Sequence, residues 1–167
     1  MSEKRPEKKP EKSAREQARR VVAENRKARY DYTILETFEA GVALLGTEVK
    51  AIREGQAGLR DSYARIDDEE VWLLNMHIGP YSHTGYASHE ERRQRKLLLH
   101  RHEIRKLVGK VAEKGLTLVP LELYFKNGRV KLLLGLARGK QAHDKRETIR
   151  RRETDRETRA AVKERSR

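Results

Sequence analysis

The chain has 167 residues, enough for one domain with a substantial core, and it is basic, with 39 Lys and Arg against 26 Asp and Glu. It contains no cysteine, which excludes disulfides, a cysteine nucleophile and thiolate metal sites and agrees with a reducing, cytoplasmic location. The N-terminus lacks the apolar stretch of a signal peptide, and no apolar run approaches the about 20 residues of a membrane span, so we expect no membrane partner.

Most of the net charge of +13 lies at the two ends of the chain. Residues 1–29 carry 11 basic and 5 acidic side chains, residues 138–167 carry 12 and 6, and residues 30–137 carry 16 and 15. Two basic arms on a nearly neutral domain are typical of a protein that binds a polyanion, most often nucleic acid. The alternative is that the arms only keep the protein in solution.

The first 45 residues predict disorder followed by strands. Residues 1–24 are charged and contain prolines, so they cannot bury enough apolar surface to become ordered, although their composition suits a transient helix over 14–24. Alternating apolar side chains predict a strand over 30–38, with Tyr30 on the same face as the later apolar residues. Gly41 predicts a turn, and residues 42–45 predict a short apolar strand.

A short helix and two strands come next. The apolar spacing predicts a helix over 48–54, with Thr47 as its N-cap and Gly55 as its C-cap. Two further strands are predicted over 61–66 and 71–78, joined by an acidic turn.

A long loop and the main helix follow these strands. Residues 79–95 have no period and predict a loop. Apolar residues at helical spacing predict a helix over 96–114, which Gly115 would end.

The clearest predicted element is a β-hairpin. Apolar residues alternate along 119–125 and again along 130–136, and Asn127-Gly128 supplies two residues that tolerate positive φ, as a type I′ turn requires. Pro120 cannot donate to a strand ladder, so we expect it at an edge or a bulge. About six short strands with glycine turns and few helices predict a small antiparallel β-barrel.

Patterns that carry catalysis or bind metals are weak in this chain. His100 and His102 lie two residues apart, which would place them on different helix faces, and the other histidines lack metal-ligand spacing. Gly139-Lys140 lacks the spacing of a phosphate-binding loop. We therefore predict no catalytic residue, metal or cofactor, and keep a metal-dependent nuclease as a distant alternative.

Several segments resemble one known family when they are taken together and in order. They are NRKARYDY, ETFEAGVALLGTEVKAIREG, DSYARI, RKLLLHRHEIRKL, KGLTLVPLELYFKNGRVKLLLGLARGK and DKR. Over about residues 25–150 the chain resembles the SsrA-binding protein family, also called small protein B or SmpB. The order and spacing of these motifs are far more specific than any single one of them.

The resemblance implies an architecture and a function. The architecture is mainly β with flanking helices: an oligonucleotide-binding-type (OB-like) antiparallel β-barrel over 25–138, between a disordered basic extension at 1–24 and a basic tail at 139–167. The tail is expected to be disordered alone and helical on the ribosome. The function is that of a bacterial, non-enzymatic RNA-binding adaptor in trans-translation, the rescue of ribosomes stalled without a stop codon. Its partners would be transfer-messenger RNA (SsrA RNA) and the stalled 70S ribosome, including small-subunit RNA, and we expect a monomer.

The resemblance also implies two groups of RNA-binding residues. The barrel group, which would bind the tRNA-like part of the RNA, comprises Asn25, Lys27, Arg29, Glu48, Lys50, Lys96, Leu97, Leu98 and Leu99. The tail group, which would occupy the decoding centre and the empty message channel, comprises Gly139, Lys140, His143, Asp144, Lys145, Arg146, Arg150 and Arg151. His143 is suited to stacking on a base. Glu48 has the alternative of capping or pairing within the fold, and the three leucines have the alternative of a place in the core.

The main alternative function is that of a structural ribosomal protein, which would share the charge, the barrel and the basic arms. A constitutive component would stay with washed ribosomal subunits, whereas an adaptor would bind transfer-messenger RNA and associate with stalled ribosomes. A nuclease would instead cleave RNA when Mg²⁺ is supplied.

Overall fold

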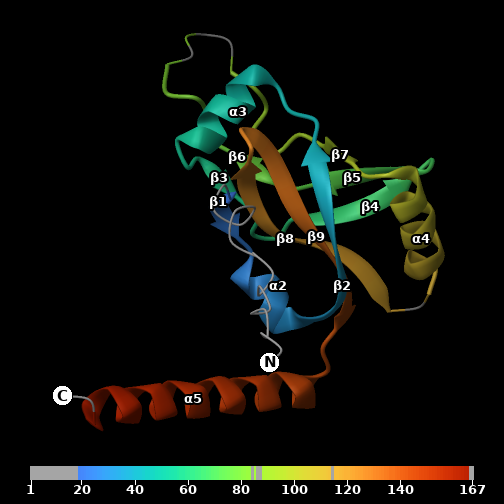
Figure 1. The fold of residues 1–167 in the computed structure, drawn as a ribbon. Helices are drawn as coiled ribbons and strands as arrows, with labels where there is room; N and C mark the ends of the chain where they lie inside the picture. Colours follow the sequence, from blue (N-terminus) through green and yellow to red (C-terminus); the bar gives the residue numbers. More distant parts are fainter. Residues whose placement is uncertain (1–18, 84, 86–87, 114, 166–167) are drawn as a thin grey trace, which may run out of the picture.

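The structure is a computed structural model of the chain and describes residues 19–83, 85, 88–113 and 115–165 (Figure 1). The side chains of residues 143, 164 and 165 are outside this description. The disorder predicted for residues 1–18 also falls outside the described residues.

The described residues form nine strands and four helices. None of these four helices is long and apolar enough to cross a membrane. In chain order the elements are β1 (Arg19–Glu24), α2 (Arg26–Asp31), β2 (Tyr32–Val42), α3 (Gly46–Arg53), β3 (Ala57–Gly58), β4 (Tyr63–Asp67), β5 (Glu70–Leu74), β6 (His77–Ile78), β7 (Arg95–Leu98), α4 (Arg101–Val111), β8 (Leu116–Lys126), β9 (Arg129–Gly139) and α5 (Ala142–Arg165).

Seven antiparallel strands form one sheet in the order β1-β8-β4-β5-β7-β2-β9, and the additional pairing of β8 with β9 closes it into a barrel. β3 and β6 form a separate two-stranded sheet. In Figure 1, α3 lies at one end of the barrel, α2 and the long α5 lie toward the other end, and α4 lies at the side. The predicted fold, a mainly β, OB-like antiparallel barrel with flanking helices, is therefore confirmed.

The hairpin of β8 and β9 has the predicted register and turn. Asn127 and Gly128 both have positive φ, 51° and 74°, and Lys126 pairs with Arg129 across them. The register of the two strands shifts immediately after Pro120, which is the bulge that its missing N–H predicts.

The hairpin carries much of the core. Leu132 and Leu134 of β9 are fully buried, together with Leu107 of α4 and Ile52 of α3, in one cluster that fills the barrel. A second, smaller cluster joins α2 to the outside of the hairpin through Ala28, Val119, Leu121 and Ala137.

The prediction that disorder or a transient helix extends to residue 24 is wrong for residues 19–24. These residues form β1, which pairs with β8 from Lys126 to Glu122. Val22 and Ala23 pack against the core, and the Arg19 guanidinium lies 3.9 Å from the centre of the Tyr124 ring. The apolar stretch of this segment is short and charged residues surround it, so its sequence pattern did not indicate a strand.

Three further predictions near the start of the domain are wrong. Tyr30 lies in α2 and not in a strand, and Gly41 lies within β2 instead of forming a turn. Residues 42–45 form no separate strand, because β2 ends at Val42 and α3 begins at Gly46. A Cβ on Gly41 would lie 3.2 Å from Cβ of Leu98, so this glycine permits a close approach of two strands.

The main helix begins later than predicted. Residues 95–98 form β7, and α4 begins only at Arg101. Arg95 and Leu97 of β7 are buried while Lys96 and Leu98 point outward, which is the alternation of a strand with one face covered.

The remaining elements differ from the predictions mainly at their ends. Residues 61–66 correspond to β4, and residues 71–78 are divided into β5 and β6 at Asn75, which has a φ of 59°. The helix predicted over 48–54 is confirmed as α3, but Leu45 occupies its N-cap position in place of Thr47.

Candidate nucleic-acid interface

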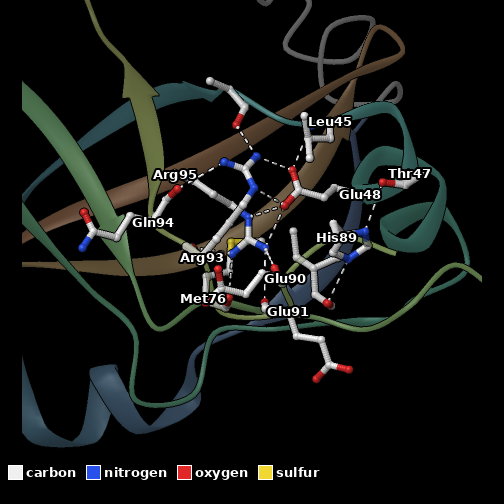
Figure 2. Close-up of polar contacts among 12 residues, drawn as sticks. Leu45, Thr47, Glu48, Met76, His89, Glu90, Glu91, Arg93, Gln94 and Arg95 are labelled. Carbon is white, nitrogen blue, oxygen red and sulfur yellow. Dashed lines mark hydrogen bonds and ion pairs between the residues drawn. The ribbon is translucent and has the colours of Figure 1, made fainter. Parts of the chain in front are cut away.

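Glu48, at the first turn of α3, is buried at the centre of a polar network (Figure 2). Its carboxylate accepts hydrogen bonds from Arg93 Nε at 2.8 Å, Arg93 Nη2 at 2.6 Å, Arg95 Nε at 2.9 Å and the backbone N–H of Leu45 at 2.8 Å. Burial alone would raise the pKa of Glu48, but these hydrogen bonds and the charge of Arg95 outweigh it and hold the pKa below its ordinary value. Glu48 is therefore an ionised residue that caps and pairs within the fold, which is the alternative that the sequence analysis gave for it.

Arg95, the first residue of β7, is also fully buried. Its guanidinium donates to the carbonyl oxygens of Met76 at 2.7 Å, Arg93 at 3.1 Å and Glu91 at 3.2 Å (Figure 2). Burial lowers the pKa of Arg95. The charge of Glu48 acts in the opposite direction, but it does not outweigh the effect of burial. The pair thus joins α3 to the loop that precedes β7, and it fixes where β7 begins.

The predicted residues of α2 divide into one structural residue and two surface cations. Asn25 is buried and caps the helix, because its Oδ1 accepts from the N–H of Ala28 at 3.1 Å. Its Nδ2 donates to the Pro120 carbonyl at 3.0 Å. Lys27 and Arg29 are exposed and each pairs with a carboxylate, Asp61 and Glu122 respectively.

The predicted residues of β7 face in different directions. Leu97 is 1% exposed and belongs to the core, whereas Leu98 is 53% exposed. Lys96 points outward and pairs with Glu70, and Leu99 is half-buried beside α4. Only Leu98 among the three leucines is a largely exposed apolar side chain.

Leu98 lies in an open groove of about 410 Å³ with an apolar floor and a basic rim. Val42, Leu44, Val49 and Val130 supply further apolar side chains, and the rim is formed by Arg129 and Lys131 of β9. We call this the Leu98 groove; it is lined by Gly41, Val42, Leu44, Val49, Leu98, Gly128, Arg129, Val130 and Lys131.

Arg129 and Lys131 were not among the predicted binding residues. The sequence did contain a signal for them, because they alternate with the buried Val130 and Leu132 directly after the Asn-Gly turn. Lys50, which was predicted, lies on α3 with its amine 5.4 Å from the centre of the Tyr81 ring. An apolar groove beside the exposed Arg129 and the half-buried Lys131 is suited to stacked bases and their phosphates.

The tail residues lie away from the Leu98 groove, on the segment that leaves the barrel beside α2 (Figure 1). Gly139 ends β9 opposite Tyr32, and the backbone N–H of Lys140 donates to the Asp31 carbonyl at 2.9 Å. Asp144, Lys145, Arg146, Arg150 and Arg151 follow on α5, on which every residue from 150 to 163 is exposed. The side chain of His143 is not described, so its predicted role in stacking stays a prediction.

The structure therefore separates the predicted residues into the barrel surface and the tail, and it shows that Asn25, Glu48 and Leu97 serve the fold itself. Among the described residues, no group of three or more His, Asp or Glu side chains is arranged to hold a metal ion.

Comparisons with known proteins agree with this arrangement. The family model described as SmpB protein matches residues 22–164. The SsrA-binding protein of Thermosynechococcus vestitus is 59% identical over 147 residues, covering 87% of this chain and 97% of that protein. The SsrA-binding protein of Mycolicibacterium vanbaalenii is 61% identical over 137 residues, covering 82% and 83%.

A solved structure described as "tmRNA-SmpB: a journey to the center of the bacterial ribosome" contains a similar chain. The two are 57% identical, with a TM-score of 0.62, and the match covers 77% of this chain and 94% of that one. The resemblance predicted from the sequence motifs is confirmed by the family model and by the identity to these relatives. This chain belongs to the SmpB protein family.

Proposed function

We propose that this protein is the RNA-binding adaptor of trans-translation: it binds the tRNA-like part of transfer-messenger RNA and delivers that RNA to ribosomes stalled without a stop codon. The observation that carries the proposal is the match, at 57% identity and over 94% of its length, to a chain described in a tmRNA–SmpB complex with the bacterial ribosome. The protein then acts in the bacterial cytoplasm, as a monomer that binds its RNA partners without catalysing a reaction.

The barrel surface is the part that binds the tRNA-like RNA. Leu98 supplies an exposed apolar contact for a base, and Arg129 and Lys131 on the rim of the Leu98 groove supply phosphate contacts. Lys50 is a further exposed cation on α3, the helix that also supplies Val49 to the Leu98 groove. Glu48 contributes indirectly, because it fixes α3, which carries Lys50, and the start of β7, which carries Leu98.

The tail is the part that reaches the ribosome. Its cations, from Lys145 to Arg151, are carried on a helix whose residues 150–163 are all exposed, which suits insertion into a channel lined by RNA phosphates. We place this helix in the decoding centre and the empty message channel, with His143 stacking on a base.

Truncation after Lys140 tests the division between barrel and tail. The shortened protein should bind transfer-messenger RNA with nearly unchanged affinity in filter-retention assays, because the barrel makes those contacts. It should lose peptide tagging of stalled ribosomes in a reconstituted translation system. Replacing Asp144, Lys145 and Arg146 together by Ala should have the same effect with the barrel intact. Tagging by the truncated protein at the level of the full chain would contradict the proposal.

The alternative of a structural ribosomal protein is tested by sedimentation. A structural component would remain on ribosomal subunits washed with high salt, and it would do so whether or not transfer-messenger RNA is present. We expect this protein to leave washed subunits and to sediment with stalled ribosomes only together with that RNA.

A further inference from the structure

A second groove lies next to the Leu98 groove, at the point where the chain leaves β7. Leu99 directly follows Leu98, and its half-buried side chain lines an open groove of about 430 Å³ between α4 and the turn that joins β4 to β5. Ile104 and Val108 of α4 complete an apolar floor, and Val108 is 42% exposed. Figure 1 shows α4 beside the end of β4. We call this the Leu99 groove, and two successive leucines thus belong to two grooves.

The rim of the Leu99 groove carries charges of both signs. Asp68 and Glu69, the two turn residues between β4 and β5, stand on one side. Arg101 and Arg105 stand on the other, four residues apart and therefore on one face of α4. All four side chains are exposed. Among the residues that the structure describes, none of these four side chains has a hydrogen-bond or ion-pair partner, so the two sides of the groove do not pair with each other.

Other charged side chains in the same region do find partners. Glu70, directly after the turn, pairs with Lys96 of β7. Lys106, which follows Arg105 on α4, pairs with Glu36 of β2. The rim of the Leu99 groove is therefore distinct from the surface around it, because it keeps carboxylates and guanidinium groups apart on opposite sides of an open apolar floor. A ligand that enters this groove meets acceptors on one side and donors on the other.

A nucleotide with an unpaired guanine has the matching chemistry. Its flat base covers an apolar floor, and its Watson–Crick edge presents two neighbouring donors, N1–H and the N2 amino group, to the oxygens of a carboxylate. Its phosphate is a bidentate partner for a guanidinium. The volume of the groove lies within the about 300–1,000 Å³ of sites that hold small ligands. Uracil has only one donor on the same edge and matches a carboxylate less well.

We propose that the Leu99 groove is a base-binding site of the barrel, which takes an unpaired guanine of the bound RNA. The turn carboxylates accept from the Watson–Crick edge, the two arginines of α4 bind the adjoining phosphate, and the leucine floor packs against the base. This inference rests on the proposed function for the identity of the RNA. RNA is favoured over a protein segment because the two grooves adjoin through Leu98 and Leu99, so an RNA that packs one base on Leu98 can place another here.

The turn permits a variant that removes the carboxylates without harming the fold. Asp68 and Glu69 have positive φ, 46° and 59°, a region that side chains other than glycine and asparagine rarely occupy. The other hairpin of this chain has Asn127-Gly128 at the same two positions of its turn. Asp68→Asn combined with Glu69→Gly should therefore melt at or above the temperature of the unchanged protein, and a loss of binding would not be a loss of fold.

Fluorescence anisotropy with short single-stranded RNA tests the recognition of guanine. The probes are a run of uridines with one central guanosine, and the same RNA with inosine, which lacks the N2 amino group. The unchanged protein should bind the guanosine probe about fivefold more tightly, and the Asn-Gly variant should bind both equally. Asp67→Asn, a neighbouring exposed carboxylate that pairs with Arg65 outside the groove, should keep the preference. Equal binding of the two probes by the unchanged protein would overturn the site.

The phosphate contact is tested by the salt dependence of the same binding. Arg105→Ala should weaken both probes alike and should reduce the slope of log affinity against log salt by about 0.7, the value for one phosphate of a single strand. Lys110→Ala removes an exposed cation of the same helix that does not line the groove, and it should change the slope less. Equal reductions by the two variants would overturn the role of α4 in the site.

Kethoxal, which reacts with N1 and N2 of unpaired guanines, locates the base in the natural partner. The unchanged protein should protect one guanine that becomes reactive again in the Asn-Gly variant. Probing the complex with transfer-messenger RNA and then the stalled ribosome decides which of the two RNAs supplies that guanine. Absence of such a guanine from both RNAs, the result also expected if a protein segment fills the groove, would overturn the site. Failure of the unchanged protein to bind transfer-messenger RNA would instead overturn the proposed function, while a preference for guanosine over inosine would still stand.

Discussion

Glu48 is a single carboxylate on which three parts of the molecule depend. It caps α3 through Leu45, and it neutralises both Arg93 and the fully buried Arg95. Removing a buried charge leaves its partners desolvated and unpaired, which costs more than the attraction alone would suggest. Glu48 therefore controls the stability of the surface that surrounds it.

Glu48→Gln should lower the free energy of unfolding at neutral pH by about 3–5 kcal/mol, because it leaves the buried Arg95 guanidinium without its counter-charge. Urea melts measure this loss. Glu36→Gln is a matched control, since Glu36 pairs with Lys106 at the surface, and it should cost less than about 1 kcal/mol. Equal losses for the two variants would mean that the buried network does not have the role given to it here.

The same residue predicts an acid-dependent stability. The folded-state pKa of Glu48 is held below its ordinary value of 4.5, so its contribution is complete above about pH 4.5 and is lost as the pH falls through the folded-state pKa. Hydrogen bonds and nearby cations also lower the pKa of Glu39 and of Asp61. These two shifts are the same in the unchanged protein and in Glu48→Gln, so they cancel in the difference between the two unfolding free energies. The difference in unfolding free energy between the unchanged protein and Glu48→Gln should therefore shrink as urea melts are repeated at lower pH. A constant difference would show that Glu48 stays ionised, or was never paired, over that range.

At the scale of elements, two adjacent residues of β7 are expected to have different roles: Leu97 stabilises the fold, and Leu98 binds RNA. Leu97→Ala removes a fully buried side chain and should cost about 2–5 kcal/mol in urea melts. Leu98→Ala removes an exposed side chain and should cost less than about 0.5 kcal/mol, yet weaken binding of the tRNA-like RNA about tenfold. Leu98→Ala with normal RNA affinity would remove the Leu98 groove from the interface.

The elements also show which parts of the fold could be predicted from sequence. The β8–β9 hairpin was predicted correctly because its signals are local: alternation on both sides of an Asn-Gly turn, and a proline at the bulge. β7 was not, because its short alternation directly precedes the helical spacing of α4 and was read as part of it. β1 was missed because a six-residue strand in a charged segment becomes stable only through its pairing with β8.

The candidate site, like the fold, could be predicted from the sequence only where its signals are local. The motifs located β7, α3 and the tail, but burial decides which of their side chains can contact RNA. Arg93 and Arg95 lie 45 and 47 residues from Glu48, so their network could not be deduced from spacing. Leu97 and Leu98 are identical in type, and only the closed barrel distinguishes them.

At the scale of the whole molecule, charge is divided between a nearly neutral barrel and two basic ends. Residues 30–137 have a net charge of +1, whereas residues 1–29 and 138–167 each have +6. Residues 138–167 begin where β9 leaves the barrel, so the positive charge of the tail is carried on α5 and on the segment that connects β9 to α5. Long-range attraction to RNA therefore comes largely from the ends, and shape-specific contacts come from the barrel.

This division predicts two different salt dependences. For Z phosphate contacts the logarithm of affinity falls with the logarithm of salt concentration with a slope of about −0.7Z to −0.9Z. Binding of the isolated tRNA-like RNA should give the same slope for the full chain and for the chain truncated after Lys140, since the tail makes no phosphate contacts with this RNA. Binding to stalled ribosomes should give a steeper slope for the full chain, because the phosphates neutralised by α5 release additional counterions. Filter retention with the RNA and sedimentation with the ribosome, each repeated over a salt series, measure the four slopes. Equal slopes on the ribosome would show that the cations of α5 make no phosphate contacts there, and a slope near zero on the isolated RNA would contradict a phosphate-binding surface on the barrel.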